Sequence, residues 1–278
     1  MDARTTGRSG TRYPTLEVLG DEGFRLFFPL SALHAALWPF IWVAVFGLGP
    51  PPGSVIPPGF WHAHEMIVGS FGVALIGFLT TSVPEWTGTP RLRGRALFLL
   101  AALWGTARLT SFVGLDAAVL VAGAADTAWM ALLIGYVMRT AYAKRTTRLN
   151  AFIFWLGLFV IAEIAARYAM TIAETDYQFA QRLIHLPGLV FLGVLGVALA
   201  RITVPVTNLV LDPTQETSPF RPHPGRLNLA PGLVALAACG EMAGLSLPVT
   251  GYLLIAAGAA FMDRVAESFI GRDFFRAE

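Results

Sequence analysis

Apolar segments of about twenty residues, separated by short polar stretches, dominate this sequence. A helix rises 1.5 Å per residue, so each segment is long enough to cross a hydrocarbon core of about 30 Å. The pattern predicts an all-α, polytopic transmembrane helix bundle, and the last two of its spans are short enough to form one re-entrant hairpin instead. We expect about eight spans, at residues 24–48, 62–86, 96–114, 117–138, 151–172, 179–205, 229–245 and 247–263.

The basic residues predict which side of the membrane each loop faces. Fifteen of the twenty Lys and Arg residues lie outside the spans, in the two tails and in the second, fourth and sixth loops. With eight spans, all of these segments fall on one side, which the positive-inside rule assigns to the cytoplasm. We therefore expect both termini in the cytoplasm, no cleaved signal peptide, and a multi-pass protein of the inner (cytoplasmic) membrane.

The same pattern predicts the domain organisation. A six-span core with a candidate haem site is joined through a proline-rich loop to a two-span hairpin, and polar tails flank both. The expected units are the cytoplasmic tail 1–23, the core 24–211, the cytoplasmic loop 212–228, the hairpin 229–263 and the cytoplasmic tail 264–278.

Composition supports the membrane assignment and excludes several kinds of site. Hydrophobic residues make up 55% and charged residues 14% of the chain, with a mean hydropathy of +0.61; soluble domains carry about 25% charged residues. The only cysteine, Cys239, excludes an intrachain disulfide and a multi-cysteine metal site. No phosphate-binding loop, dinucleotide fingerprint, nucleophile elbow or HExxH motif occurs, so the sequence assigns no catalytic activity. We expect the lipid bilayer as a partner and no nucleic acid.

Ionisable residues inside the spans point to a polar layer near the outer face. Such residues are costly in a bilayer and usually mark a functional site or pair with one another. Neutral imidazoles ligate haem iron and arginines bind haem propionates, so a layer holding both predicts a haem site. His34 lies nearer mid-membrane and is a further candidate ligand. The residues that share the outer layer are His62, His64, His185, Arg108, Arg167 and Arg182.

Structural roles are the alternative for these residues. Each arginine can reach the headgroups or pair locally, as Glu163 and Arg167 can at a spacing of four. The two histidines at the start of the second span can simply cap it at the interface. Asp126, Glu163 and Glu241 fit either hydrogen bonding between helices or an ion route, and a transporter would use Asp126, Glu163 and Arg201.

Helical spacing separates the two histidines of the motif GFWHAHEM at residues 59–66. Positions two apart on a helix point about 200° from each other, so His62 and His64 cannot bind one ion in a regular helix. Glu65 and Met66 do share a face with His62. Because imidazole and thioether ligands suit Cu(I), His62, Glu65 and Met66 form a candidate copper site.

The same motif is the centre of a resemblance to the NnrS family of haem- and copper-containing membrane proteins linked to nitric oxide metabolism. Similar segments are FRLFFPLSALHAALWPFIW in the first span, GFLTTSVPEWTGTPRLRGRALFLLAALWGTARL after the motif, and ARITVPVTNLVL at the end of the sixth span. The resemblance covers residues 24–109 strongly and 145–211 more weakly. Family members are longer and carry a histidine where this chain has AEIAARYAM, so the chain resembles a shortened member.

The resemblance implies a haem-binding, and by extension copper-binding, membrane protein of the nitric oxide response. The alternative is a non-catalytic accessory or assembly subunit of a larger respiratory-type membrane complex. Trp61, inside the motif, is a further candidate for cofactor binding. The positions that match the family pattern are His62, His64, Glu65, Pro84, Trp86, Arg108, Arg201 and Asn208.

Overall fold

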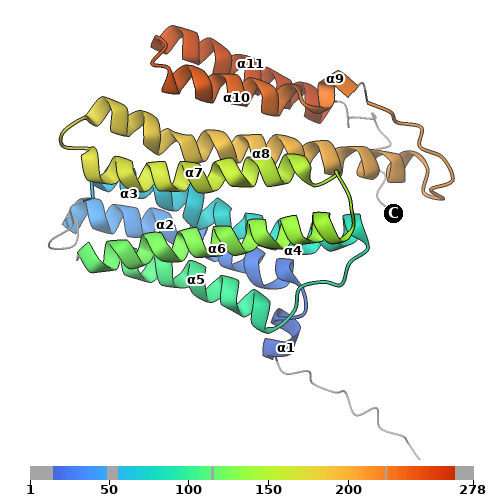
Figure 1. Cartoon of the computed structure of the whole chain (residues 1–278), viewed down its shortest axis with the longest axis horizontal. Helices are drawn as coiled ribbons and strands as arrows, with labels where there is room; N and C mark the ends of the chain where they lie inside the picture. Colours follow the sequence, from blue (N-terminus) through green and yellow to red (C-terminus); the bar gives the residue numbers. More distant parts are fainter. Residues whose placement is uncertain (1–14, 49–55, 114–115, 223, 267–278) are drawn as a thin grey trace, which may run out of the picture.

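The computed structural model describes residues 15–48, 56–113, 116–222 and 224–266, and within these ranges it contains helices and no strand (Figure 1). The all-α prediction is confirmed. Most of the two tails and His223 lie outside the described residues. The elements are α1 (Thr15–Leu19), α2 (Gly23–Leu48), α3 (Pro58–His64), the π-helix η1 (Glu65–Phe71), α4 (Gly72–Thr87), α5 (Arg95–Ser111), α6 (Asp116–Ala143), α7 (Asn150–Ile172), α8 (Tyr177–Leu211), α9 (Pro224–Leu227), α10 (Leu229–Met242) and α11 (Leu247–Ala266).

Six helical segments in the described ranges are long and apolar enough to cross a membrane. One of them combines α3, η1 and α4 into a single rod over Pro58–Thr87. The 35-residue α8 reaches about 52 Å at 1.5 Å per residue and is therefore longer than a bilayer core is thick. The chain is thus a multi-pass membrane protein.

Two of the eight predicted spans correspond to shorter helices. The third is α5, with 17 residues, and the seventh is α10, with 14 residues. At 1.5 Å per residue these helices measure about 26 Å and 21 Å, less than the usual 30 Å core. The count of eight and the cytoplasmic position of both termini stay predictions.

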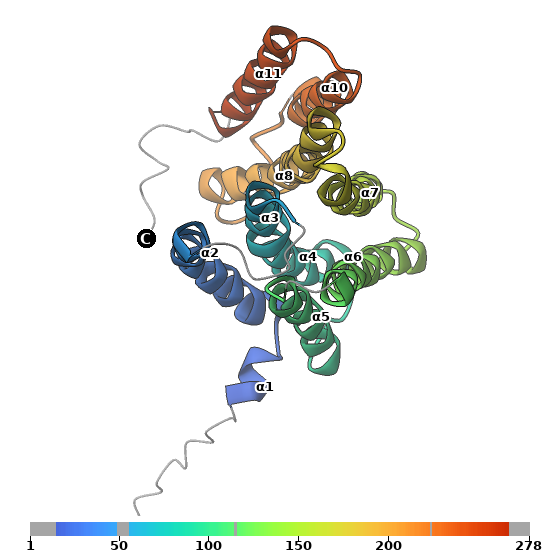
Figure 2. The ribbon, with the colours of Figure 1, turned by 90° about the vertical axis from the view of Figure 1, so that its left-hand side faces the viewer.

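The long helices lie side by side, and the C-terminal hairpin flanks them. Helix α7 packs along α8, α5 along α6, and α2 along α4. Seen along the helices in Figure 2, the rod containing α3 and α4 lies in the middle of the bundle, while α10 and α11 lie at one side against α8. The rod is accordingly the most buried of the candidate spans, with 61% of its apolar window inside the protein.

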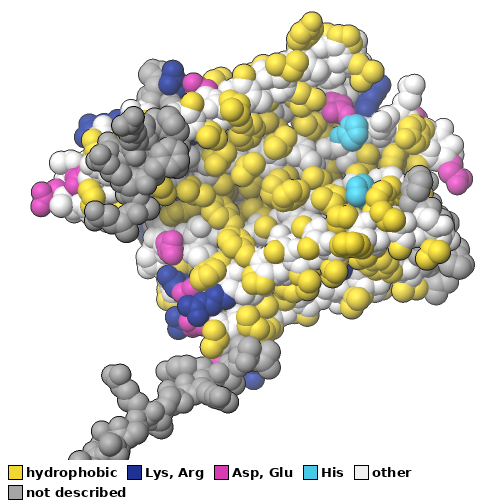
Figure 3. All heavy atoms as spheres, turned by 180° about the vertical axis from the view of Figure 1, so that it is seen from behind, with side chains coloured by type: hydrophobic (Ala, Val, Ile, Leu, Met, Phe, Trp, Pro, Cys, Tyr) yellow, Lys and Arg dark blue, Asp and Glu magenta, His cyan; other side chains and the backbone are white. Residues whose placement is uncertain are grey.

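The outer surface of the bundle is largely hydrophobic. Figure 3 shows one face on which apolar side chains form a broad field, with charged side chains gathered towards its ends. Many large apolar side chains are exposed, among them Phe40, Leu109 and Leu120, each at least 74% accessible. Exposure on this scale is unfavourable in water and favourable against lipid tails.

A glycine allows the close approach of α7 and α8. A Cβ atom on Gly193 would lie 2.1 Å from the Trp155 ring, because the indole occupies the space next to the α8 backbone. Small residues of this kind let helix backbones approach closely in membranes, where van der Waals packing replaces the hydrophobic driving force.

The segment after α8 is anchored by two polar side chains. Asn208 both donates to and accepts from the Phe220 backbone, at 3.1 and 2.7 Å. The Asp212 carboxylate accepts hydrogen bonds from the side chains and backbone amides of Thr214 and Thr217. These hydrogen bonds, led by those of the two threonine side chains, hold the pKa of Asp212 down at about 2. The anchor therefore persists at any pH well above 2.

Replacing Gly193 with alanine tests the packing of α7 on α8. Overpacking of this kind costs about 1–3 kcal/mol, so we expect Gly193→Ala to lower the melting temperature of the purified protein in detergent, followed by tryptophan fluorescence. Gly258→Ala is the matched control, because a Cβ there meets nothing within 4 Å. Equal melting temperatures for the two variants would show that the contact does not limit the packing.

Candidate functional site

Six ionisable side chains from five elements meet inside the bundle, at the level of the motif histidines. All lie within the described residues, and all three carboxylates are 0% accessible. We call this group the buried ion cluster. Its members are His64 on α3, Glu65 on η1, Arg108 on α5, Asp126 on α6, and Glu163 and Arg167 on α7.

Asp126 binds both arginines of the cluster. Its Oδ2 atom accepts a hydrogen bond from Arg108 Nη2 and another from Arg167 Nη2. The second carboxylate oxygen, Oδ1, accepts from Trp129 Nε1 at 2.9 Å. One carboxylate therefore joins α5, α6 and α7, which satisfies the demand that buried charges be paired.

Glu163 links the same arginine to the histidine of the motif. Arg167 Nε donates to Glu163 Oε1 at 2.8 Å, across the four-residue spacing noted in the sequence. The other oxygen, Oε2, lies 2.7 Å from His64 Nε2. The contact ties α3 to α7 across 99 residues of sequence. Sequence spacing could suggest the first contact but not the second.

Glu65 has charged neighbours without a well-formed hydrogen bond. Its Oε2 lies 3.2 Å from Arg108 Nη1 and 3.6 Å from His34 Nε2, and its Oε1 lies 3.5 Å from His64 Nδ1. Neither oxygen has a hydrogen-bond partner, nor does His64 Nδ1. Glu65 is therefore the least satisfied carboxylate of the cluster.

The π-helix and a glycine make room for Glu65. Helix geometry changes from α to π at Glu65, and such bulges commonly occur at functional sites. A Cβ on Gly69 would lie 2.7 Å from His34 Cε1 and 2.8 Å from Arg108 Nη1. The Gly69 carbonyl also accepts a hydrogen bond from Trp104 Nε1 at 2.9 Å. The absence of a side chain at Gly69 thus allows these groups to surround Glu65.

The cluster is open at one edge, through a groove of about 370 Å³ along α6 and α7. Arg167, 16% accessible, is the cluster member that lines this groove, together with apolar residues such as Val119 and Ile164. The rest of the cluster is closed or nearly closed to the outside.

His62 points away from His64, towards the tryptophans of α2. Its Nδ1 accepts a hydrogen bond from Trp38 Nε1 at 2.8 Å, and its ring lies 4.2 Å from the Trp42 ring. The Trp61 ring packs 4.8 Å from Trp38. An indole N–H only donates, so a neutral His62 ring carries its proton on Nε2. Neither ring nitrogen of His62 therefore has a free lone pair for a metal in this arrangement.

His34 is also engaged at both ring nitrogens. Nδ1 lies 2.8 Å from the Ser70 hydroxyl, and Nε2 faces Glu65. The ring stacks on Trp38 at 5.3 Å.

His185 contacts α10 instead of the motif. Its Nδ1 lies 2.6 Å from Glu241 Oε1, and its side chain is 49% accessible. One turn earlier, the Arg182 guanidinium lies close to Gly244, beyond the C-terminal end of α10. Glu241 could not be assigned to His185 from sequence, because 56 residues separate the two.

A family model described as NnrS protein matches residues 18–277. The chain belongs to the NnrS family. Comparisons with curated proteins and with solved structures gave no match. The resemblance seen in the motif GFWHAHEM thus extends over nearly the whole chain, and the motif itself covers most of α3 and the start of η1.

Other positions predicted from the NnrS pattern lie apart from the cluster. Arg201 Nη2 donates to the Arg148 carbonyl at 2.6 Å, at the opposite end of the bundle. Asn208 anchors the loop after α8, as described above. Met66, grouped with His62 and Glu65 as a copper site, packs with the apolar residues around Trp61, so the three side chains have different surroundings.

The charges of the cluster in this NnrS-family chain nearly cancel one another. Three carboxylates face two guanidinium groups, which leaves one negative charge if His64 is neutral. Ligand atoms of His64, Asp126 and Glu163 lie within 4.8 Å of one another, close enough for a metal ion. A metal there would lie beside two guanidinium groups. A protonated His64 ring also balances the charge, and both of its N–H groups then face carboxylates.

Removing one charge and then its counter-charge tests this balance. Leaving a buried charge unpaired costs about 3–5 kcal/mol, so we expect His64→Gln to lower the free energy of unfolding by that order. Adding Glu65→Gln restores neutrality. The double variant should regain at least about 1 kcal/mol of the lost free energy of unfolding, a typical coupling between neighbouring groups. Denaturant titration in detergent measures both effects, with His62→Gln as the control. Simple additivity of the two changes would contradict the charge balance.

Proposed function

We propose that this NnrS-family membrane protein binds haem at His185 and takes part in the response to nitric oxide at the inner membrane. Family membership supports the link to haem and nitric oxide, and the apolar helices support the membrane location. The observation that carries the proposal for this chain is that His185 combines a carboxylate partner at one ring nitrogen with an exposed ring.

Among the four described histidines, His185 has the arrangement expected of a metal ligand. Ligating histidines usually donate their second ring N–H to a carboxylate, which fixes the tautomer and the ring orientation. Glu241 accepts this hydrogen bond from His185 Nδ1, which leaves the Nε2 lone pair free on a half-exposed side chain. In contrast, the rings of His34 and His62 are held by Ser70 and Trp38. His64 also has a carboxylate partner, Glu163, but its side chain is buried and its other ring nitrogen, Nδ1, faces Glu65 Oε1 at 3.5 Å.

The residues around His185 suit the other part of a haem. Arg182 lies three positions earlier, on the same side of α8, and a guanidinium can bind a propionate through two hydrogen bonds. When bound, haem would supply an iron atom able to take a diatomic ligand such as nitric oxide. The protein would hold and orient the group through His185, Glu241 and Arg182. A half-exposed ligand is also compatible with the accessory-subunit alternative, in which a partner protein covers the other side of the cofactor.

Absorption spectroscopy of the purified protein tests this function. We expect a Soret band that shifts on reduction and on addition of nitric oxide. His185→Ala should abolish the band, whereas His62→Ala, which changes a histidine held by Trp38, should keep it. Glu241→Gln should keep the haem but weaken its retention about 10–100-fold, as found for partners of metal-bound histidines.

Three outcomes separate the possibilities. A colourless preparation without iron would overturn haem binding. A colourless protein that retains a stoichiometric partner, and gains a Soret band only with that partner, would support the accessory role. A Soret band that His185→Ala leaves intact would place the ligand elsewhere.

A further inference from the structure

The turn between α6 and α7 carries an unneutralised positive charge. From Arg139 to Asn150 the sequence reads RTAYAKRTTRLN, with four basic residues and no acidic one. Within the described parts of the chain, no carboxylate lies at ion-pair distance from Arg139, Arg145 or Arg148. Lys144 donates to the Gly88 carbonyl, a neutral group.

A second basic turn lies at the same end of the bundle, and its arginines are paired with carboxylates. Between α4 and α5, Arg91 pairs with Glu22 and Glu85, and Arg93 pairs with Asp21 at 3.2 Å. Lys144 joins the two turns through Gly88, so they are neighbours. The chain thus neutralises one of two adjacent basic turns with its own carboxylates and leaves the other without them.

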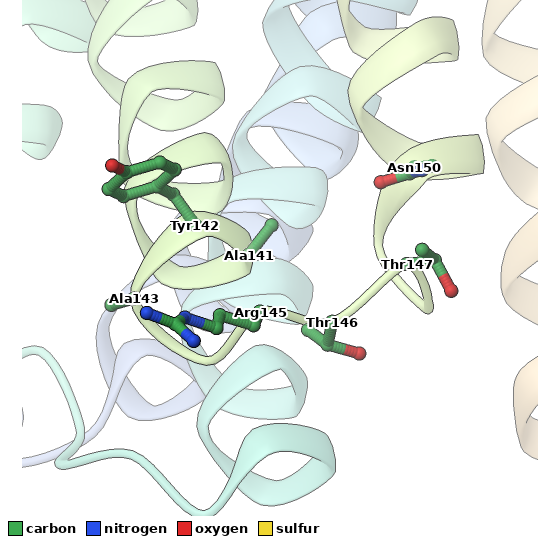
Figure 4. A pocket seen from close by; sticks show the side chains of 7 residues that line it. All are labelled: Ala141, Tyr142, Ala143, Arg145, Thr146, Thr147 and Asn150. Carbon is green, nitrogen blue, oxygen red and sulfur yellow. The ribbon is translucent and has the colours of Figure 1, made fainter.

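The unneutralised turn also forms a pocket of about 560 Å³. Figure 4 shows that Asn150, at the start of α7, points into the space between α6 and α7, and that the Arg145 side chain runs under the end of α6. The hydroxyl groups of Thr146 and Thr147 lie along the turn that connects α6 to α7. The pocket is lined by Ala141, Tyr142, Ala143, Arg145, Thr146, Thr147 and Asn150.

Local backbone geometry favours an anion at this place. Arg145 has a φ of 49°, the left-handed conformation that commonly ends a helix, and the Thr146 amide donates to the Ala141 carbonyl of the last turn of α6. Helix α7 starts beside the pocket without a side-chain cap, and its dipole is positive at this end. The Asn150 amide donates to the Thr147 carbonyl at 3.1 Å, so the next amides of the first turn are the ones without a partner inside the helix. Guanidinium, hydroxyl, amide and backbone N–H groups are the usual ligands of a phosphate.

We propose that this pocket binds the phosphate headgroup of an anionic membrane phospholipid. It lies where two membrane-crossing helices end, so a headgroup in that leaflet is at the right depth. Tyr142, 87% accessible at the pocket edge, is the type of residue that prefers the interface between headgroups and acyl chains. Basic pockets at the cytoplasmic ends of transmembrane helices attract anionic lipids, and the positive-inside rule assigns this turn to the cytoplasm.

Binding of phosphatidylglycerol to the full chain tests the proposal. Native mass spectrometry of the protein in detergent, titrated with phosphatidylglycerol or phosphatidylcholine, gives the affinity for each lipid. We expect selective binding of phosphatidylglycerol, weakened about 10–30-fold in the double variant Arg145→Gly and Arg148→Gln, since each basic residue near an anionic surface contributes a few-fold. Glycine adopts the left-handed conformation at position 145, so this variant should keep the fold.

The neighbouring turn supplies a matched control. Arg91→Gln with Arg93→Gln removes two positive charges from the same end of the bundle and should leave lipid affinity nearly unchanged. Equal weakening by both double variants, or no weakening by the first, would overturn the proposal. A free phosphate ion is the other source of the same chemistry: displacement of the lipid by millimolar inorganic phosphate would identify it as the ligand and reject the lipid.

Discussion

The pairing of charges inside a bundle surrounded by lipid is the constraint on which the rest of this structure depends. Three carboxylates with no accessible surface lie among two guanidinium groups and an imidazole, contributed by five elements. A single buried charge left without a partner is strongly destabilising, so each element must take the position that brings its charge to the others. The cluster therefore fixes the mutual placement of α3, η1, α5, α6 and α7, where apolar contacts with lipid and with protein differ little in energy.

Several backbone features follow from this demand. The change from α- to π-geometry at Glu65 and the bare backbone at Gly69 give Glu65, His34 and Arg108 the room to meet. Trp104 and Trp129 use their N–H groups to complete the hydrogen bonds around the cluster. Aromatic residues of this type bring large apolar surface together with one polar group, which suits the boundary between an ion cluster and an apolar core.

Three of the described histidines contact other side chains inside the bundle, and the fourth, His185, lies at its surface. His64 belongs to the buried ion cluster, and His34 lies at its edge, facing Glu65. His62 accepts a hydrogen bond from Trp38. His185, oriented by Glu241 on the C-terminal hairpin, keeps a free nitrogen at the surface of the bundle. In this arrangement two ionisable residues of the motif GFWHAHEM, His64 and Glu65, lie in the buried ion cluster. The ring nitrogen that we propose for the cofactor lies on a different helix, about 120 residues further along the chain.

The sequence by itself determined the all-α class, the ranges of the long membrane helices and the family, because hydrophobic period, length and motif are local properties. It also allowed the Glu163–Arg167 pair, which is a four-residue spacing on one helix. Only the tertiary structure decided that Asp126 joins Arg108 to Arg167, that His64 meets Glu163, and that His185 meets Glu241. Those pairs cross between helices, and apolar helix surfaces leave rotation and neighbour choice open. Buried charges remove that freedom, since few arrangements of the helices pair all of them at once.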